Sequence, residues 1–300
     1  MPLTEATKHK LDTLIRFVIW VDITILLLYF LSLQFGVSFP FPLPGKKLNN
    51  PLALLLLLFS IRLMLNVPFR SRHLGTLNRL LTDIPHRFYF FAFLIVVEFA
   101  LQIMWFTYPD DFRWNLDFER GYGTHFSAIQ LYILGLVVMM AAWADYGKKV
   151  GWKEKLPWYH LVASVYFYIG LDDCIGIHDN IAWSRSLFPK STVFHFIYEW
   201  LWLYGPPILI TVVFLSWFFL KKFLYSPGII ATMFVALALW VSVLLLEGLA
   251  KNIVYPMGLD YKRLLISIEE GSEMLGATLF MLGFSKHLKN IQERKVEIPQ

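Results

Sequence analysis

Cysteine and charged residues are both scarce in this 300-residue chain, and each scarcity excludes a class of protein. Cys174 is the only cysteine, which rules out a disulfide framework within the chain and any zinc or iron–sulfur site built from several cysteines. We expect its thiol to be a small buried group. Only 16% of the residues are charged and 57% are hydrophobic, whereas a soluble domain has roughly 25% charged residues. The composition is typical of an integral membrane protein.

Several catalytic motifs are also missing. The sequence has no His-Glu-x-x-His zinc-protease helix, no Gly-x-Ser-x-Gly nucleophile turn, no phosphate-binding P-loop and no His-x-x-x-His box of the membrane desaturases. The net charge of +5 does not indicate nucleic-acid binding, because the basic residues lie in short segments beside apolar runs. We therefore expect the lipid bilayer and other membrane subunits as partners, and no nucleic acid.

Apolar runs long enough to cross a bilayer recur along the whole chain. Since a spanning helix needs roughly 20 apolar residues, the sequence predicts an all-α bundle of about eight transmembrane helices. We expect one membrane domain, residues 1–300, in which residues 1–110 hold the first three spans. Lysine and arginine favour a topology with both termini in the cytoplasm. The predicted spans are residues 13–35, 51–67, 87–107, 125–146, 157–182, 194–224, 228–250 and 263–287.

Two segments carry local structural signals. Residues 69–81 mix basic and apolar side chains at helical spacing, which predicts an amphipathic helix in the membrane interface. Gly205, Pro206 and Pro207 predict a kink or break in the sixth span, because proline lacks a backbone donor and clashes with the preceding turn.

Some polar residues inside the predicted spans are expected to be structural. Asp22 and Arg62 are expected to pair between the first two spans. Glu98 stands alone in the third span, so a hydroxyl or amide partner on a neighbouring helix and a functional role are both open. His160 and His287 are expected to be hydrogen-bonded packing residues.

The remaining ionisable residues are the most informative feature of the chain. An ionised side chain in a membrane span costs a few kcal/mol or more, so such residues usually belong to a site. In the predicted topology they come from four spans and one loop and share one level, in the outer half of the bilayer. They are Asp172, Asp173, His178 and Asp179, then His195 and Glu199, then Glu247, then Glu269, Glu270 and Glu273, with Glu119 and His125 before and at the start of the fourth span.

So many carboxylates cannot all stay ionised together in a low dielectric, so protons or cations must neutralise them. Carboxylates with two imidazoles suit Mn, Fe or Zn, and oxygen ligands alone suit Ca. We expect a divalent metal ion, no organic cofactor, and Glu270 and His178 as the catalytic residues. The expected metal ligands are Asp172, Asp173, His178, Asp179, His195, Glu199, Glu269 and Glu273, with Glu119, His125 and Glu247 in supporting positions.

Two stretches of the chain resemble a group of uncharacterised bacterial multi-span membrane proteins. Leu171–Asp179 and Ile268–Gly276 are similar to that group's pattern, approximately Asp-Glu-x4-His-Glu followed by Glu-Glu-x2-Glu-Met-x-Gly. Asp173 and Asp179 stand where the group has Glu. The resemblance covers about residues 114–285. It implies a bacterial inner membrane location and a shared site, but it does not imply a reaction.

Three functions are open at this point. The favoured one is a metal-dependent membrane enzyme, hydrolytic or oxidative, acting on a lipid-like or small apolar substrate at the outer face. The second is a proton- or cation-coupled transporter, against which the scarcity of acidic residues in the inner half counts. The third is a structural subunit of a larger membrane complex, in which the cluster holds helices together.

Overall fold

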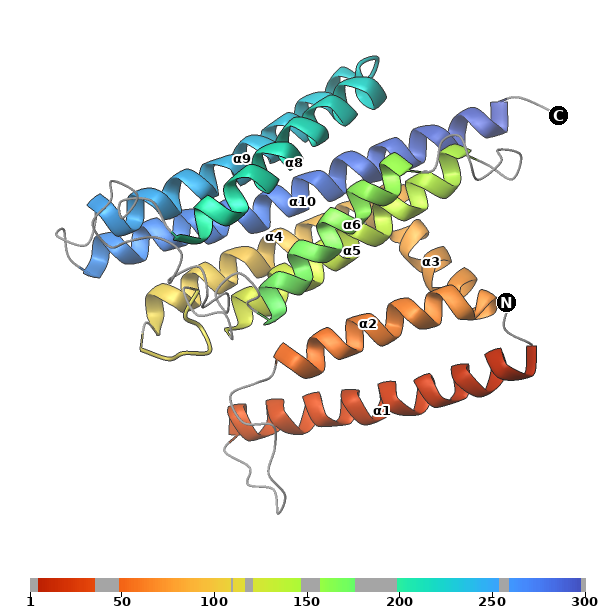
Figure 1. The fold of residues 1–300 in the computed structure, drawn as a ribbon, viewed down its shortest axis with the longest axis horizontal. Coiled ribbons are helices and arrows are strands. Elements are labelled where there is room, and N and C mark those ends of the chain that lie inside the picture. Colours follow the sequence, from red (N-terminus) through yellow and green to blue (C-terminus); the bar gives the residue numbers. More distant parts are fainter. Residues whose placement is uncertain are drawn as a thin grey trace. The chain divides into compact units, whose positions relative to one another are not determined.

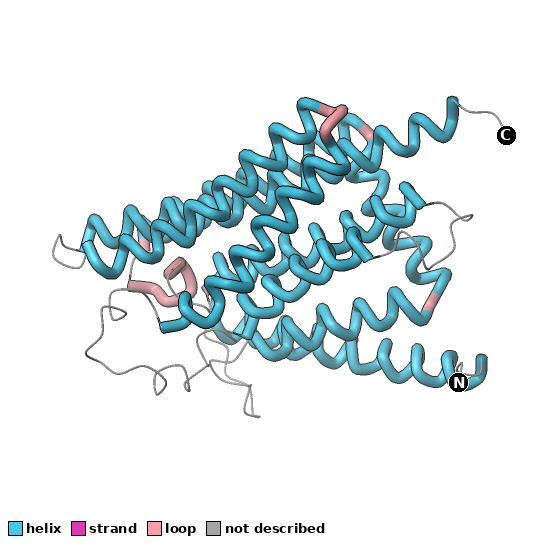
Figure 2. The backbone as a smooth tube through the Cα atoms, turned by 45° about the horizontal axis from the view of Figure 1, so that its top comes forward, coloured by secondary structure: helices cyan, strands magenta, loops and turns pink. Residues whose placement is uncertain are grey.

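The structure, a computed structural model, is entirely α-helical in its regular parts. Figure 2 shows helices and loops, with no strand among the described residues, which confirms the predicted fold class. By their contacts the residues divide into two compact units, Met1–Arg79 and Leu80–Gln300. The described residues are 5–35, 49–108, 110–116, 121–146, 157–175, 199–253 and 259–297.

The helices follow the chain in the order drawn in Figure 1. They are α1 (Glu5–Phe35), α2 (Asn49–Leu65), α3 (Val67–Thr82), α4 (Ile84–Thr107), α5 (Tyr122–Tyr146), α6 (Pro157–Ile175), α8 (Glu199–Phe223), α9 (Pro227–Ile253) and α10 (Leu259–Glu297).

Four described helices are long and apolar enough to cross a membrane. They coincide with four of the predicted spans, which supports a membrane protein, whereas the count of about eight spans, the single domain and the cytoplasmic termini stay predictions. Helices α2 and α3 meet at a bend of 111° and together would make a fifth span. The four are Ile84–Thr107, Tyr122–Asp145, Gly205–Phe223 and Pro227–Leu246.

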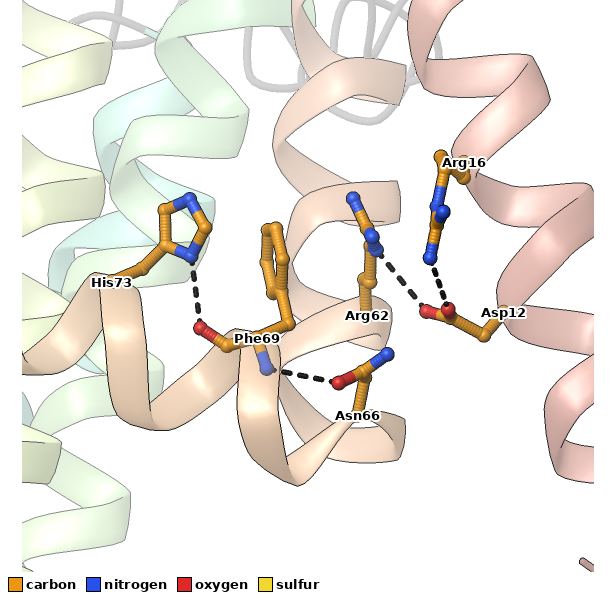
Figure 3. A network of polar contacts seen from close by, with 6 residues as sticks. All are labelled: Asp12, Arg16, Arg62, Asn66, Phe69 and His73. Atoms are coloured by element: carbon orange, nitrogen blue, oxygen red, sulfur yellow. Dashed lines mark hydrogen bonds and ion pairs between the residues drawn. The ribbon is translucent and has the colours of Figure 1, made fainter.

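In the first unit, the predicted pair between Asp22 and Arg62 is wrong. Arg62 Nε donates to Asp12 Oδ1 at 3.1 Å, and Arg16 donates to the other oxygen of Asp12 at 3.2 Å (Figure 3). Asp22 lies ten residues further along α1, about 15 Å at 1.5 Å per residue, which is too far for the same guanidinium. Asp22 is only 3% exposed, and its Oδ2 has no hydrogen-bond partner in the described part of the chain.

The bend before α3 is built from local contacts. Asn66 Oδ1 accepts a hydrogen bond from the Phe69 backbone N–H at 2.9 Å, which caps the first turn of α3 (Figure 3). The Arg62 guanidinium lies 4.0 Å from the centre of the Phe69 ring. The predicted helix at residues 69–81 is confirmed within α3, and its place in the membrane interface stays a prediction.

In the second unit, α5 and α10 form the centre. Helix α10 contacts α9, α5 and α4, and α5 also packs along α6 (Figure 1). Two glycines allow this close packing. A Cβ at Gly170 would lie 3.1 Å from the Ala128 carbonyl oxygen, and a Cβ at Gly276 would lie 2.4 Å from Trp240 Cδ1.

Helix α8 corrects one part of a second sequence prediction. It continues through Pro206 and Pro207, so the helix is not broken there, whereas the kink that was the alternative stays a prediction. Both prolines lie near its start, where they remove only the hydrogen bonds to the carbonyl groups of residues 202 and 203. The Thr211 hydroxyl donates to the Pro207 carbonyl at 2.9 Å.

A short loop after α4 closes one end of the second unit. In it Arg113 forms an ion pair with Asp111, and hydrogen bonds from this guanidinium lower the pKa of the Asp111 carboxyl group below its usual value. Trp105 is 4% exposed and packs in an apolar cluster with Leu116 and Met274. This cluster joins the loop to α4 and α10.

Candidate functional site

The structure describes about half of the predicted site. Asp172 and Asp173 lie in the last turn of α6, and His125 lies in the first turn of α5. Helix α10 carries Glu269, Glu270 and Glu273. The side chains of Glu199 and Glu247, together with His178, Asp179, His195 and Glu119, lie outside the described residues.

Ser127 brings two of the predicted carboxyl groups together. Its Oγ lies 3.0 Å from Asp173 Oδ2 and 2.9 Å from Glu273 Oε1, so both carboxyl groups contact the same hydroxyl group. Ser127 is 2% exposed. The site therefore joins α5, α6 and α10, as the sequence predicted for α6 and α10, but through a serine that the sequence analysis did not select.

The Ser127 hydroxyl lies between two carboxyl groups but can donate a hydrogen bond to only one of them. A hydroxyl group has one proton and donates it to one acceptor at a time. Two carboxylates on one hydroxyl group repel each other in a low dielectric, and a second proton or another cation between them relieves this repulsion. The arrangement of Asp173, Ser127 and Glu273 is thus suited to bind and release a cation.

A second buried carboxyl group, that of Glu98 on α4, lies beside a later turn of α10. Glu98 Oε1 accepts hydrogen bonds from Thr278 Oγ1 at 2.6 Å and from Gln130 Nε2 at 2.8 Å. The three side chains are between 1% and 7% exposed. Of the two alternatives left open for Glu98, the structure shows the hydroxyl and amide partners. Gln130 lies one helical turn after Ser127 on α5, so the two groups of polar contacts are neighbours.

A third polar contact lies on the other side of the Ser127 contacts, nearer to the start of α10. The Ser267 hydroxyl on α10 donates a short hydrogen bond to Gln102 Oε1 on α4. Gln102 lies one turn after Glu98, and its buried Nε2 has no hydrogen-bond partner among the residues described. We call the series the polar column. Its members are Gln102, Ser267, Ser127, Asp173, Glu273, Glu98, Gln130 and Thr278.

Aromatic side chains border the polar column. Trp240 Nε1 donates to the Glu273 backbone carbonyl at 3.1 Å, and the rings of Tyr166 and Trp240 meet edge to face, with centroids 5.7 Å apart. The Tyr166 hydroxyl is buried and has no partner within the described ranges. Buried polar atoms of this kind usually bind an ordered water or a ligand.

The predicted metal centre is not shown by this part of the chain. Among the described residues, no three His, Cys, Asp or Glu side chains are grouped so that they could hold a metal ion. His125 Nδ1 lies 2.6 Å from the Gly121 carbonyl oxygen, and its buried Nε2 has no partner among the described residues. Because His178 and His195 lie outside those residues, the divalent metal site stays a prediction.

The sequence analysis missed a second polar cluster, near the other end of α10. The Tyr159 hydroxyl lies 2.8 Å from His287 Nε2 and 3.2 Å from Asp145 Oδ2, and Lys222 Nζ donates to Asp145 Oδ2 at 2.8 Å. We call these four residues the inner cluster. His287 is hydrogen-bonded, as predicted, but it lies beside an ion pair. Since each member comes from a different helix, no spacing in the sequence could reveal the group.

A family model described as a domain of unknown function, DUF8692, matches residues 87–288. The match covers more than half of the chain and includes the polar column and the inner cluster. Searches of curated proteins and of solved structures give no match.

Proposed function

The chain belongs to the DUF8692 family, and we propose that it is a proton-coupled membrane transporter in which Asp173 and Glu273 bind and release a proton. The observation that carries this proposal is the Ser127 hydroxyl, which lies within hydrogen-bond distance of both carboxyl groups. One hydroxyl proton is too few for two carboxylates, and a shared proton completes the contact. Ionisable groups inside membrane helices commonly serve as such proton sites.

The sequence analysis counted the scarcity of acidic residues in the inner half against transport. The inner cluster bears on this point. Asp145 and His287 supply titratable groups towards the end of α10 that we expect in the cytoplasm. Thr278 and His287 are nine residues apart on α10, about 13 Å at 1.5 Å per residue. Between them Phe280 and Phe284 are fully buried. In the proposed function this apolar section keeps protons from passing between the two polar groups unless the helices move.

Infrared difference spectroscopy on the purified chain tests the proton site. We expect the C=O band of a protonated carboxylic acid near neutral pH, and we expect its loss in Glu273→Gln and in Asp173→Asn. The matched control is Glu293→Gln on the same helix, because the Glu293 side chain is 58% exposed and its carboxylate is hydrated. If the wild-type spectrum contains no such band, or if Glu293→Gln removes it equally, the proposed proton site does not exist.

The metal-dependent enzyme remains a second candidate because of one further feature. Asp173 lies in the last turn of α6, five residues before His178 in the sequence, so a ligand set could continue from the carboxyl pair into that segment. Elemental analysis of the purified chain separates the candidates. A stoichiometric divalent ion in the wild type that is lost in Glu273→Gln would favour the enzyme over the proton site.

A further inference from the structure

A pocket of about 430 Å³ lies in the second unit where α4 and α9 begin and α10 approaches its end. Its lining contains three basic residues, Arg87 from α4 and Lys286 and Lys289 from α10. The first turn of α9, residues 226–229, and the Asn290 amide complete it. We call it the basic pocket. It is separate from the polar column and from the inner cluster.

The basic pocket is lined by cations without an acidic counterpart, since none of its lining residues is Asp or Glu. Two acidic side chains lie close by. Glu293 pairs with Lys289 at 3.4 Å and is largely exposed, and Asp83, one turn before Arg87, pairs with the exposed His86. The interaction energy of exposed ion pairs is small because water screens them. These two acidic side chains therefore do not neutralise the pocket, which keeps a positive charge.

The start of α9 adds a second attraction for anions. Ser226 accepts hydrogen bonds from the backbone N–H groups of Ile229 and Ile230. The Ser226 N–H donates to the Phe223 carbonyl and Pro227 has no N–H, so the Gly228 N–H is the donor of residues 226–229 that remains for a ligand. It lies at the end of a helix that carries partial positive charge. A Cβ built on Gly228 would have no heavy atom within 4 Å, so the backbone is open towards the pocket.

The position of the basic pocket favours a lipid headgroup over a soluble phosphate compound as its ligand. Two of the candidate membrane spans, Ile84–Thr107 and Pro227–Leu246, begin at its edge, which places it at the level of the lipid headgroups. It also lies at the basic end of the unit, which we expect in the cytoplasm. Basic pockets between membrane helices on that side bind the headgroups of anionic lipids.

We propose that the basic pocket binds the phosphate group of an anionic phospholipid. The three basic side chains contact the phosphate oxygens, and the Gly228 N–H in the first turn of α9 supplies one backbone donor. The acyl chains extend along the apolar surfaces of α4 and α9, where Phe88 and Val235 are more than half exposed.

Lipid titration of the full chain in detergent micelles tests the proposal. Phosphatidylglycerol is compared with phosphatidylcholine, and bound lipid is counted by native mass spectrometry. In Lys286→Gln/Lys289→Gln we expect phosphatidylglycerol to bind about 25-fold more weakly, since each basic side chain near an anionic surface contributes a factor of roughly five. The control Lys221→Gln/Arg294→Gln removes the same charge at the same end, outside the pocket, and should retain binding within about threefold.

A steric variant tests the site independently of charge. In Gly228→Leu the new Cβ meets no heavy atom within 4 Å, and the side chain takes up space in the pocket and should reduce phosphatidylglycerol binding at least tenfold. Its control is Gly75→Leu, because a Cβ on Gly75 in α3 also meets nothing within 4 Å. Circular dichroism and gel filtration establish that each variant is folded.

Two results would overturn the proposal. Equal losses in the Lys286/Lys289 and Lys221/Arg294 pairs would show a diffuse surface charge instead of a pocket. Binding of inorganic phosphate or glycerol phosphate as tight as that of phosphatidylglycerol would assign the pocket to a soluble phosphate compound.

Discussion

At the scale of single residues, neutral polar side chains organise the buried carboxyl groups. Ser127, Gln130 and Thr278 hold Asp173, Glu273 and Glu98 in place. The sequence predicted Asp173 and Glu273 as site residues because ionisable side chains are costly in a membrane. It could not predict their neutral partners, because serine, threonine and glutamine in an apolar helix usually bond to the backbone or to any nearby group.

Replacing Ser127 tests this organisation. Ser127→Ala leaves Asp173 and Glu273 without their common donor, and we expect a loss of about 1–3 kcal/mol in stability. Ser127→Thr keeps the hydroxyl group and should retain most of the stability. Thermal unfolding in detergent measures both. Equal melting temperatures for wild type and Ser127→Ala would show that the bridge does not contribute to the fold.

At the scale of elements, hydropathy located helices well and side-chain partners poorly. The apolar runs predicted the four helices that, among the described residues, are long and apolar enough to span a membrane. The predicted partner of Arg62 was wrong. Asp12 and Asp22 are both acidic residues on α1, and the position of α1 along α2 decides which of them Arg62 contacts. Hydropathy does not encode that position. The break expected at Pro206 was wrong because a helix can lose two hydrogen bonds near its start and continue.

The two aspartates of α1 should therefore respond differently to substitution. Asp12→Asn removes the charge that holds Arg62 and Arg16, and we expect a loss of about 1–2 kcal/mol. Asp22→Asn removes a buried charge without an ion-pair partner in the described residues, and we expect no loss or a small gain. Denaturant titration of the purified chain gives both values. A larger loss in Asp22→Asn would contradict the observed pairing.

The contact between α9 and α10 depends on Gly276. In Gly276→Ala the new methyl group would lie 2.4 Å from Trp240 Cδ1, so the indole ring must move and its hydrogen bond to the Glu273 carbonyl weakens. We expect a loss of about 1–3 kcal/mol. Gly228→Ala, where the methyl group meets open space, is the matched control and should unfold near the wild-type temperature.

At the scale of the whole molecule, α10 connects the polar column, the inner cluster and the basic pocket. The family match over residues 87–288 contains all three. The sequence predicted the importance of Glu269, Glu270 and Glu273 on this helix, since three carboxylates within five residues are conspicuous in an apolar segment. It gave no indication of the inner cluster, because one residue from each of four helices meets there.

The inner cluster should stabilise the ends of four helices together. Tyr159→Phe removes the hydroxyl that lies between His287 and Asp145 without a change of shape, and we expect a loss of about 1–2 kcal/mol. Hydrogen exchange should then increase at the last turns of α5 and α8 as well as near residue 159. Faster exchange at α6 alone would mean that the cluster does not act as a unit.

The order of α4, α5, α6 and α10 in the chain has a consequence for biosynthesis. Helices are made in chain order, so α4, α5 and α6 are synthesised before α10, which begins at Leu259. Until then Glu98 has Gln130 but lacks Thr278, and Asp173 has Ser127 but lacks Glu273. A nascent protein that stalls before α10 would contain carboxyl groups with only part of their hydrogen-bond partners. Cellular quality control removes proteins with defects of this kind.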